Sequence, residues 1–97
     1  MDEKAEKKAT RTVTVRSRQG LHARPASLIA RLSRSFDAKV YLVRDRERVD
    51  ATDVIHILAL GIMPEQELRL EAVGAQAEEA ADAIARLIAE ELPKIED

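Results

Sequence analysis

The chain has 97 residues and a formal net charge of −2, with 45% apolar residues, 2% aromatic residues and no cysteine. This length allows one domain with a modest aliphatic core, and the lack of cysteine excludes disulfides, thiolate zinc sites and a cysteine nucleophile. So few aromatic side chains cannot form the stacking platforms that bind single-stranded nucleic acids, so we expect no nucleic-acid partner.

The first ten residues are polar and rich in Lys and Glu. They predict a flexible leader over residues 1–10, and not a signal peptide, followed by a single domain over residues 11–97. No run approaches the roughly 20 apolar residues of a membrane-spanning helix, so we expect no direct membrane insertion. A small domain without cysteines suits a reducing compartment, and we therefore expect a cytoplasmic protein.

The first half of the domain predicts a strand, a helix and a hairpin. Residues 12–15 alternate and are rich in β-branched side chains, which is typical of a strand. Pro25 is tolerated in a first helical turn, and the apolar residues after it recur at helical spacing, which predicts a helix over about 23–33. Two short strands over 39–43 and 48–51, joined by a polar turn, are most simply connected as a β-hairpin.

The second half begins with a short apolar run. Thr52 or Asp53 can cap a helix over residues 54–60, and Gly61 ends it as a C-terminal glycine does. The run is β-branched, so propensity alone would also allow a strand, but the cap and the glycine favour a helix. Residues 68–73 alternate between apolar and polar side chains and predict the last strand.

The final segment has the clearest pattern in the sequence. Residues 77–92 carry one apolar stripe at i, i+3 and i+4 spacing, which predicts an amphipathic helix that Pro93 closes. The element order is therefore β-α-β-β-α-β-α. Amphipathic helices with one apolar stripe each predict an α+β fold, in which a four-stranded, mostly antiparallel sheet is covered on one face by helices.

Charge is unevenly divided along the chain. Residues 11–48 contain ten Lys or Arg and three Asp or Glu, whereas residues 49–97 contain three and twelve. Such a division can indicate an anionic partner for the basic half. The alternative is that the two halves interleave in the fold and their charges pair.

Only His22 and His56 ordinarily titrate near neutral pH. His22 lies where a loop meets the N-terminus of the first predicted helix. The first N–H groups of a helix have no partner within it, and the helix dipole attracts anions. Arg24 adds a planar cation that matches phosphate oxygens. A neutral imidazole at this point can attack phosphorus and become a phosphohistidine.

The alternative for His22 is a surface or capping histidine that happens to precede a helix. No second catalytic group is evident beside it, and two histidines are too few to indicate a metal site. We therefore expect neither a metal nor a cofactor.

The segment Gly20-Leu21-His22-Ala23-Arg24-Pro25-Ala26 resembles the active-site signature of the HPr family, the histidine-containing phosphocarriers of the bacterial phosphotransferase system. The resemblance covers about residues 11–92 and includes the element order, which in that family forms an open-faced β-sandwich. It implies that His22 accepts a phosphoryl group from phosphorylated Enzyme I through Nδ1 and passes it to an EIIA domain or protein. Arg24, at the helix N-terminus formed by residues 23–25, would stabilise the phosphate.

The resemblance also implies roles for residues of the second predicted helix. Asp53 stands where many members carry a serine that HPr kinase phosphorylates. Capping alone explains an aspartate there, and the alternative is a permanent mimic of the phosphorylated serine. Val54, Ile55 and Leu58 fall where the family exposes an apolar patch to partners, and Ile55 is the contact we expect. His56 should face solvent near that patch without being a second phosphorylation site.

Two other functions stay open. Residues 36–40 and the acidic start of the last helix at residues 78–80 are similar to NPr, the carrier of the nitrogen-related branch, which is regulatory and does not transport sugar. The second alternative is a non-phosphorylated interaction module of the same fold. Such regulators usually replace the histidine, which this chain retains. We expect a monomeric phosphoryl relay rather than a turnover enzyme.

Overall fold

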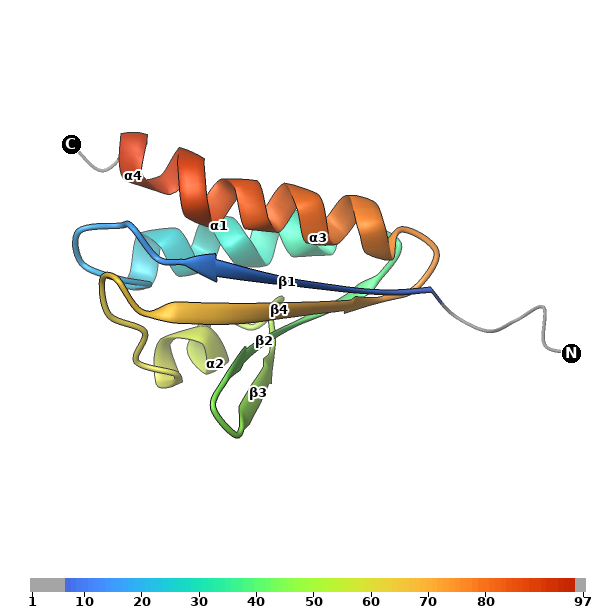
Figure 1. Ribbon diagram of the computed structural model, residues 1–97, viewed down its shortest axis with the longest axis horizontal. Coiled ribbons are helices and arrows are strands. Elements are labelled where there is room, and N and C mark those ends of the chain that lie inside the picture. The colour runs from blue at the N-terminus through green and yellow to red at the C-terminus, as the bar shows by residue number, and fades with distance from the viewer. Residues whose placement is uncertain (1–6, 96–97) are drawn as a thin grey trace, which may run out of the picture.

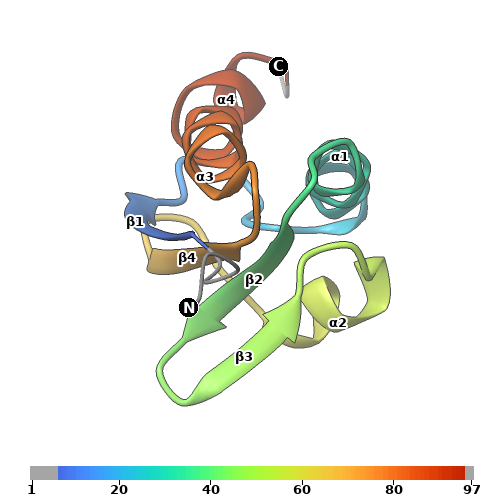
Figure 2. The ribbon, with the colours of Figure 1, turned by 90° about the vertical axis from the view of Figure 1, so that its right-hand side faces the viewer.

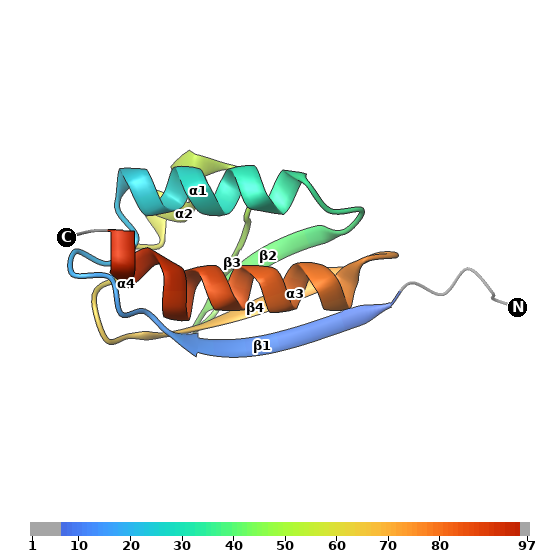
Figure 3. The same cartoon turned by 90° about the horizontal axis from the view of Figure 1, so that it is seen from above.

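The computed structural model describes residues 7–95, and its elements follow the predicted order. They are β1 (Lys8–Thr14), α1 (Ala23–Arg34), β2 (Lys39–Arg44), β3 (Glu47–Asp50), α2 (Val54–Ala59), β4 (Glu67–Val73) and α3 (Ala77–Arg86), which continues through a π-helical turn η1 (Leu87–Glu91) into α4 (Leu92–Ile95). Helices α1 and α3 lie antiparallel, side by side, on one face of the sheet (Figures 1 and 3). The predicted α+β class is confirmed.

The four strands form one antiparallel sheet in the order β1-β4-β2-β3. Seen end-on, the sheet has α1 and α3 above it, and α2 lies beside the β3 edge, below α1 (Figure 2). Alternate side chains face the helices, and the largest fully buried ones are aliphatic, among them Ile29, Leu42, Leu70, Ile84 and Ile88. An aliphatic core is what a chain with 2% aromatic residues must build.

The other face of the sheet carries polar side chains. Arg48 lies over the ring of Tyr41, with its guanidinium carbon 3.7 Å from the ring centre. Its Nε lies 3.1 Å from Glu71 Oε1, and the other carboxylate oxygen of Glu71, Oε2, lies 3.3 Å from Arg69 Nη2. This network explains how the sheet leaves one face open without exposing its core.

The first strand begins earlier than the sequence indicated. Residues 8–10, which we placed in the flexible leader, belong to β1, where Lys8 lies opposite Val73 and Thr10 lies opposite Glu71. The reason is tertiary, since β4 would otherwise present unpaired backbone groups along this edge. Residues 1–6 of the predicted leader lie outside the described residues.

The prediction that Pro93 closes the last helix is wrong, because the helix continues to Ile95. A proline inside an α-helix removes one N–H and its ring clashes with the carbonyl four residues earlier. Here a π-helical turn immediately precedes it, and the backbone N–H of Leu92 donates to the carbonyl of Leu87, five residues back. This wider turn accommodates the ring without ending the helix.

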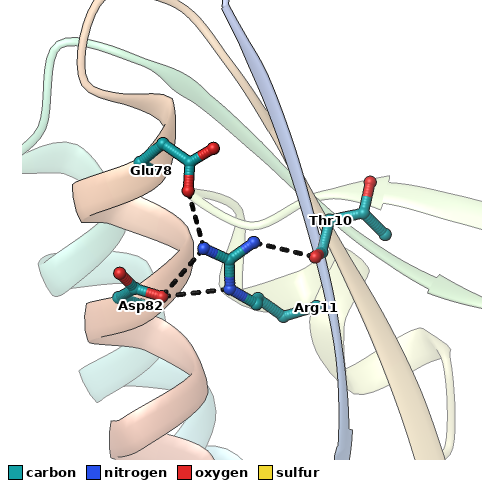
Figure 4. A network of polar contacts seen from close by, with 4 residues as sticks. All are labelled: Thr10, Arg11, Glu78 and Asp82. Carbon is teal, nitrogen blue, oxygen red and sulfur yellow. Dashed lines mark hydrogen bonds and ion pairs between the residues drawn. The ribbon is translucent and has the colours of Figure 1, made fainter.

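An arginine ties the edge strand to the last helix. Arg11 Nη2 lies 2.7 Å from Glu78 and 2.9 Å from Asp82, and Nη1 donates to the carbonyl of Thr10 (Figure 4). The hydrogen bonds to Glu78 and then to Asp82 raise the pKa of Arg11 above its already high value. The guanidinium therefore stays charged and holds β1 against α3.

Replacing Arg11 by glutamine should lower the free energy of unfolding by about 1 kcal/mol, because each partly exposed ion pair contributes at most about that much. Urea denaturation checks this. Arg46→Gln is the matched control, since Arg46 is exposed in the β2–β3 turn and should change stability by less than about 0.5 kcal/mol. The Arg11 effect should shrink in 1 M salt, and an equal loss in both variants at all salt concentrations would contradict an ionic contribution.

Candidate functional site

His22 is the N-cap residue of α1. Its backbone is extended (φ −82°, ψ −166°), and its carbonyl accepts the first helical hydrogen bond from Ala26 N at 2.9 Å. The N–H groups of Ala23 and Arg24 precede that bond, so they have no partner within the helix. Pro25 has no N–H to leave unsatisfied. The first turn contains no acidic residue, so the positive end of a 12-residue helix points to the loop that carries His22.

The loop before His22 is held by a contact that is distant in sequence. The backbone N–H of Leu21 donates to the carbonyl of Ile62 at 3.0 Å. Gly20 has φ +69°, and a Cβ on it would lie 2.1 Å from the same Ile62 oxygen. Only glycine allows the two loops to approach this closely. The loop between α2 and β4 therefore positions His22.

A depression of about 200 Å³ opens at His22 and is lined by Arg18, Gln19, His22 and Arg24. The structure thus brings together His22 and Arg24, the two residues that the sequence assigned to phosphoryl chemistry. It adds Arg18 and Gln19, which belong to no motif in the sequence. They occupy the corners of a turn closed by Gly20 N and Ser17 O, so their place beside His22 depends on how that turn folds back.

Asp53 caps the second predicted helix. Its Oδ1 accepts from the backbone N–H of His56 at 3.2 Å, and its Oδ2 lies 3.3 Å from His56 Nδ1. Of the two capping residues considered, Asp53 and not Thr52 is the cap. Thr52 instead donates its backbone N–H and its hydroxyl to Asp50, and these two hydrogen bonds lower the pKa of Asp50. The side chain of His56 is 57% exposed, as expected of a solvent-facing residue.

The apolar residues of α2 divide between core and solvent. Ile57 is fully buried, whereas Ile55 is 70% exposed and Leu58 is 36% exposed. Val54 is half-buried and packs against the core. The sequence did not identify Met63, which is 58% exposed and follows the Ile62 carbonyl that holds the His22 loop.

Helix α2 runs along α1 in the opposite direction. Arg34, at the C-terminal end of α1, donates to the carbonyl of Thr52 at 2.8 Å. Ile62, beyond the C-terminal end of α2, accepts from Leu21 at the start of α1. Asp53 therefore lies toward the far end of α1, which is about 18 Å long. Its charge is therefore remote from His22.

Part of the charge division is resolved by pairing between the two halves. The ion pairs of Arg11, Arg16 and Arg48 are with Glu78, Asp82, Glu65 and Glu71, so bases from the first half meet acids from the second. Within residues 7–95 no cluster of His, Asp and Glu could hold a metal ion. No helix in that range is long and apolar enough to cross a membrane.

Comparison with known proteins identifies the family of this chain. The family model described as the PTS HPr component phosphorylation site matches residues 9–90. The phosphocarrier protein HPr of Treponema pallidum is 42% identical over 77 residues, which are 79% of this chain and 88% of the relative. The phosphocarrier protein NPr of Escherichia coli is 38% identical over 77 residues, which are 78% of this chain and 86% of the relative.

The fold agrees as well. The crystal structure of HPr from Bacillus anthracis superposes with a TM-score of 0.80 at 30% sequence identity, over 84% of this chain and 96% of that one. The resemblance found in the sequence and the predicted sandwich are both confirmed. Because the family model spans most of the chain, the protein belongs to the HPr family, the phosphocarrier proteins of the phosphotransferase system.

Proposed function

We propose that this phosphocarrier accepts its phosphoryl group on His22 from phosphorylated Enzyme I and passes it to an EIIA domain or protein. The observation that carries the proposal is the place of His22, half-buried at the start of α1 in a depression that it shares with Arg24. An imidazole at this point lies beside a permanent cation and the positive end of a helix, the surroundings that a phosphoryl group requires.

The transfer needs one nucleophile and no cofactor. The lone pair of His22 Nδ1 attacks phosphorus, the bond from phosphorus to the donor breaks, and its electron pair stays with the donor. The other imidazole nitrogen keeps its hydrogen throughout, so no proton has to move. The guanidinium of Arg24 and the N–H groups of Ala23 and Arg24 would hold the phosphoryl oxygens, and Pro25 fixes where those N–H groups begin.

Labelled phosphoenolpyruvate tests the proposal directly. In the presence of Enzyme I the chain should acquire a label that is lost in acid and kept in alkali, as expected of a phosphohistidine. Adding an EIIA protein should then transfer the label. An unlabelled chain would favour the non-phosphorylated interaction module, and a label that survives acid but not alkali would indicate a phosphorylated hydroxyl.

We place the chain with the general phosphotransferase system and not with the nitrogen branch. The identity to an HPr (42%) exceeds that to an NPr (38%), which supports this assignment. Initial rates of transfer from the two types of Enzyme I at equal concentration test it. The Enzyme I of sugar transport should be faster, and a faster rate from the nitrogen-related Enzyme I would assign the chain to the regulatory branch.

We propose the cytoplasm as the place of this relay, and a monomer as its form. The proposal is supported by the lack of a membrane-spanning helix among residues 7–95 and by the need of Enzyme I and EIIA to reach the same residue in turn. Sedimentation at micromolar concentration should give the mass of one chain.

The partner would dock over the exposed apolar residues of α2, namely Ile55 and Leu58, with Val54 at their edge. Ile55 is 70% exposed, although Ile57, two residues on, is fully buried. The chain's own fold therefore does not use the Ile55 side chain, and a partner could bury it with a gain of about 1.5–3 kcal/mol.

Replacing Ile55 by serine should raise the KM for transfer from Enzyme I about tenfold and leave the rate at saturation unchanged, because docking and not chemistry is affected. Stability in urea should be unchanged. Ile95→Ser is the matched control, since Ile95 is an exposed isoleucine on α4, on the opposite side of α1 from α2 (Figure 2). Equal KM values for the two variants would rule out the proposed docking surface.

For Asp53 we propose the role of a helix cap and not that of a phosphoserine mimic. Asp53→Ala should lose about 1 kcal/mol of unfolding free energy, since the bond to His56 N is lost. Asp53→Ser keeps a capping oxygen and removes the charge, so its stability and its KM for Enzyme I should both stay near those of the original chain. A clearly lower KM in Asp53→Ser, measured without HPr kinase, would instead support the mimic.

A further inference from the structure

The depression at His22 has guanidinium groups from two different elements. Arg24 comes from the first turn of α1, whereas Arg18 comes from the loop before it, and both line the same space as His22. We infer that Arg18 is a second phosphoryl-binding residue, so that a phosphoryl group on His22 is held between two guanidiniums. The inference rests on the proposed function, because it names a further residue of the same site.

The turn that carries Arg18 is well fixed. Gly20 N donates to Ser17 O at 3.0 Å, which closes the turn with Arg18 and Gln19 at its corners. Ser17 is fully buried and Leu21 is 4% exposed, so the turn is anchored on both sides. Arg18 and Gln19 themselves are exposed. The backbone therefore presents Arg18 at the depression at little cost in conformational entropy.

The size of the depression suits this use. A water molecule takes about 30 Å³ in the liquid, so a space of about 200 Å³ admits the four heavy atoms of a phosphoryl group and leaves room for solvent. The amide of Gln19 lines the same space and adds a neutral donor. A guanidinium on each side can meet different oxygens of one phosphoryl group through charge-assisted hydrogen bonds.

The neighbouring arginine of the loop has a different setting. Arg16 pairs with Glu65 at 3.1 Å, and both side chains are more than half exposed. It does not line the depression at His22. Arg16 and Arg18 thus carry the same charge in the same loop, and only one faces the phosphoryl position. This pair provides a control in which net charge changes equally.

The consequence is electrostatic and can be measured on the phosphorylated chain alone. A cation next to a phosphohistidine disfavours the binding of a further proton, so removing the cation raises the affinity of the phosphohistidine for a proton. Because Arg18 is exposed, solvent screens the interaction and the effect should be modest. Salt should weaken it further.

The experiment uses phosphoramidate as a small phosphoryl donor, so that docking to Enzyme I plays no part. The full chain and its Arg18→Gln, Arg18→Lys and Arg16→Gln variants are phosphorylated, and the phosphorus NMR signal that is missing from His22→Ala is followed as the pH is varied through the neutral and alkaline range, in which the phosphohistidine is not lost. Arg18→Gln should raise the proton affinity of the phosphohistidine about two- to fivefold. Arg18→Lys should restore most of the original value, and Arg16→Gln should leave it nearly unchanged. The shift should diminish in 1 M salt.

Several results would overturn the inference. Equal titrations of Arg18→Gln and the original chain would show that Arg18 does not contact the phosphoryl group, and equal shifts in Arg18→Gln and Arg16→Gln would show a net-charge effect only. Matching urea midpoints exclude a folding defect. Failure of the proposed function is distinguishable, since then Enzyme I would not label His22 even though phosphoramidate does. If neither reagent phosphorylates His22, both proposals fall.

Discussion

His22→Ala should acquire no label from Enzyme I and phosphoenolpyruvate, whereas the original chain is labelled to completion. The reason is chemical, since the variant lacks the imidazole that we propose as the nucleophile at the depression of α1. The fold should remain, because the side chain of His22 makes no capping hydrogen bond to the helix, and the loss of unfolding free energy should stay below about 1 kcal/mol. Scintillation counting of the isolated protein and a urea curve measure the two quantities.

His56→Ala is the matched control for this loss. His56 is the second histidine of the chain and is 57% exposed on α2. Its variant should be labelled as fully as the original chain. Labelling that persists in His22→Ala, or that disappears in His56→Ala, would move the phosphorylation site and with it the proposed mechanism.

Gly20→Ala should cost about 2–4 kcal/mol of unfolding free energy. The residue has φ +69°, a conformation that costs a residue with a side chain about 1 kcal/mol or more. The new Cβ would also lie 2.1 Å from the carbonyl oxygen of Ile62, and overpacking of this kind costs about 1–3 kcal/mol. The loss is large against a total of about 5–15 kcal/mol for a domain of this size. Urea denaturation measures it.

Gly61→Ala isolates the backbone part of this effect. Gly61 has φ +64°, close to that of Gly20, but a Cβ on it would meet nothing within 4 Å. This variant should therefore lose only about 1 kcal/mol of unfolding free energy.

The folded Gly20→Ala protein should also be phosphorylated more slowly, because the Ile62 carbonyl can no longer hold the His22 loop in place. Equal losses in the two variants would contradict the steric contact between the loops.

Most of the fold could be predicted from the sequence because its signals are local. Residues 77–86 are helical because one apolar stripe recurs at helical spacing, and the stripe is buried in the structure. Asp53 caps α2, and Gly61 follows it with a positive φ. In each case the residue that signals the element lies within a few residues of the groups it contacts. The rest of the chain is therefore not needed for the prediction.

The two errors have a different origin. Residues 8–10 follow the Lys- and Glu-rich start of the chain and were predicted as part of the leader, yet they form part of β1 because β4 offers them backbone partners. A proline normally ends a helix, but the π-helical turn over Leu87–Glu91 makes room for the ring of Pro93. No residue near 8–10 in the sequence indicates that β4 pairs with them. At Pro93 the local signal predicts the end of the helix, which is wrong.

The sequence by itself predicted the helix start and placed the proposed nucleophile beside a cation, because His22, Arg24 and Pro25 lie within four residues and share one local geometry. Only the tertiary structure decided which further groups meet them. Arg18 reaches the depression because its turn folds back toward α1, and the loop is held there by an oxygen of Ile62, forty residues beyond His22. The pairing of the basic and acidic halves was decided in the same way, since contacts such as Arg11 with Glu78 exist only after the sheet and the last helix have packed.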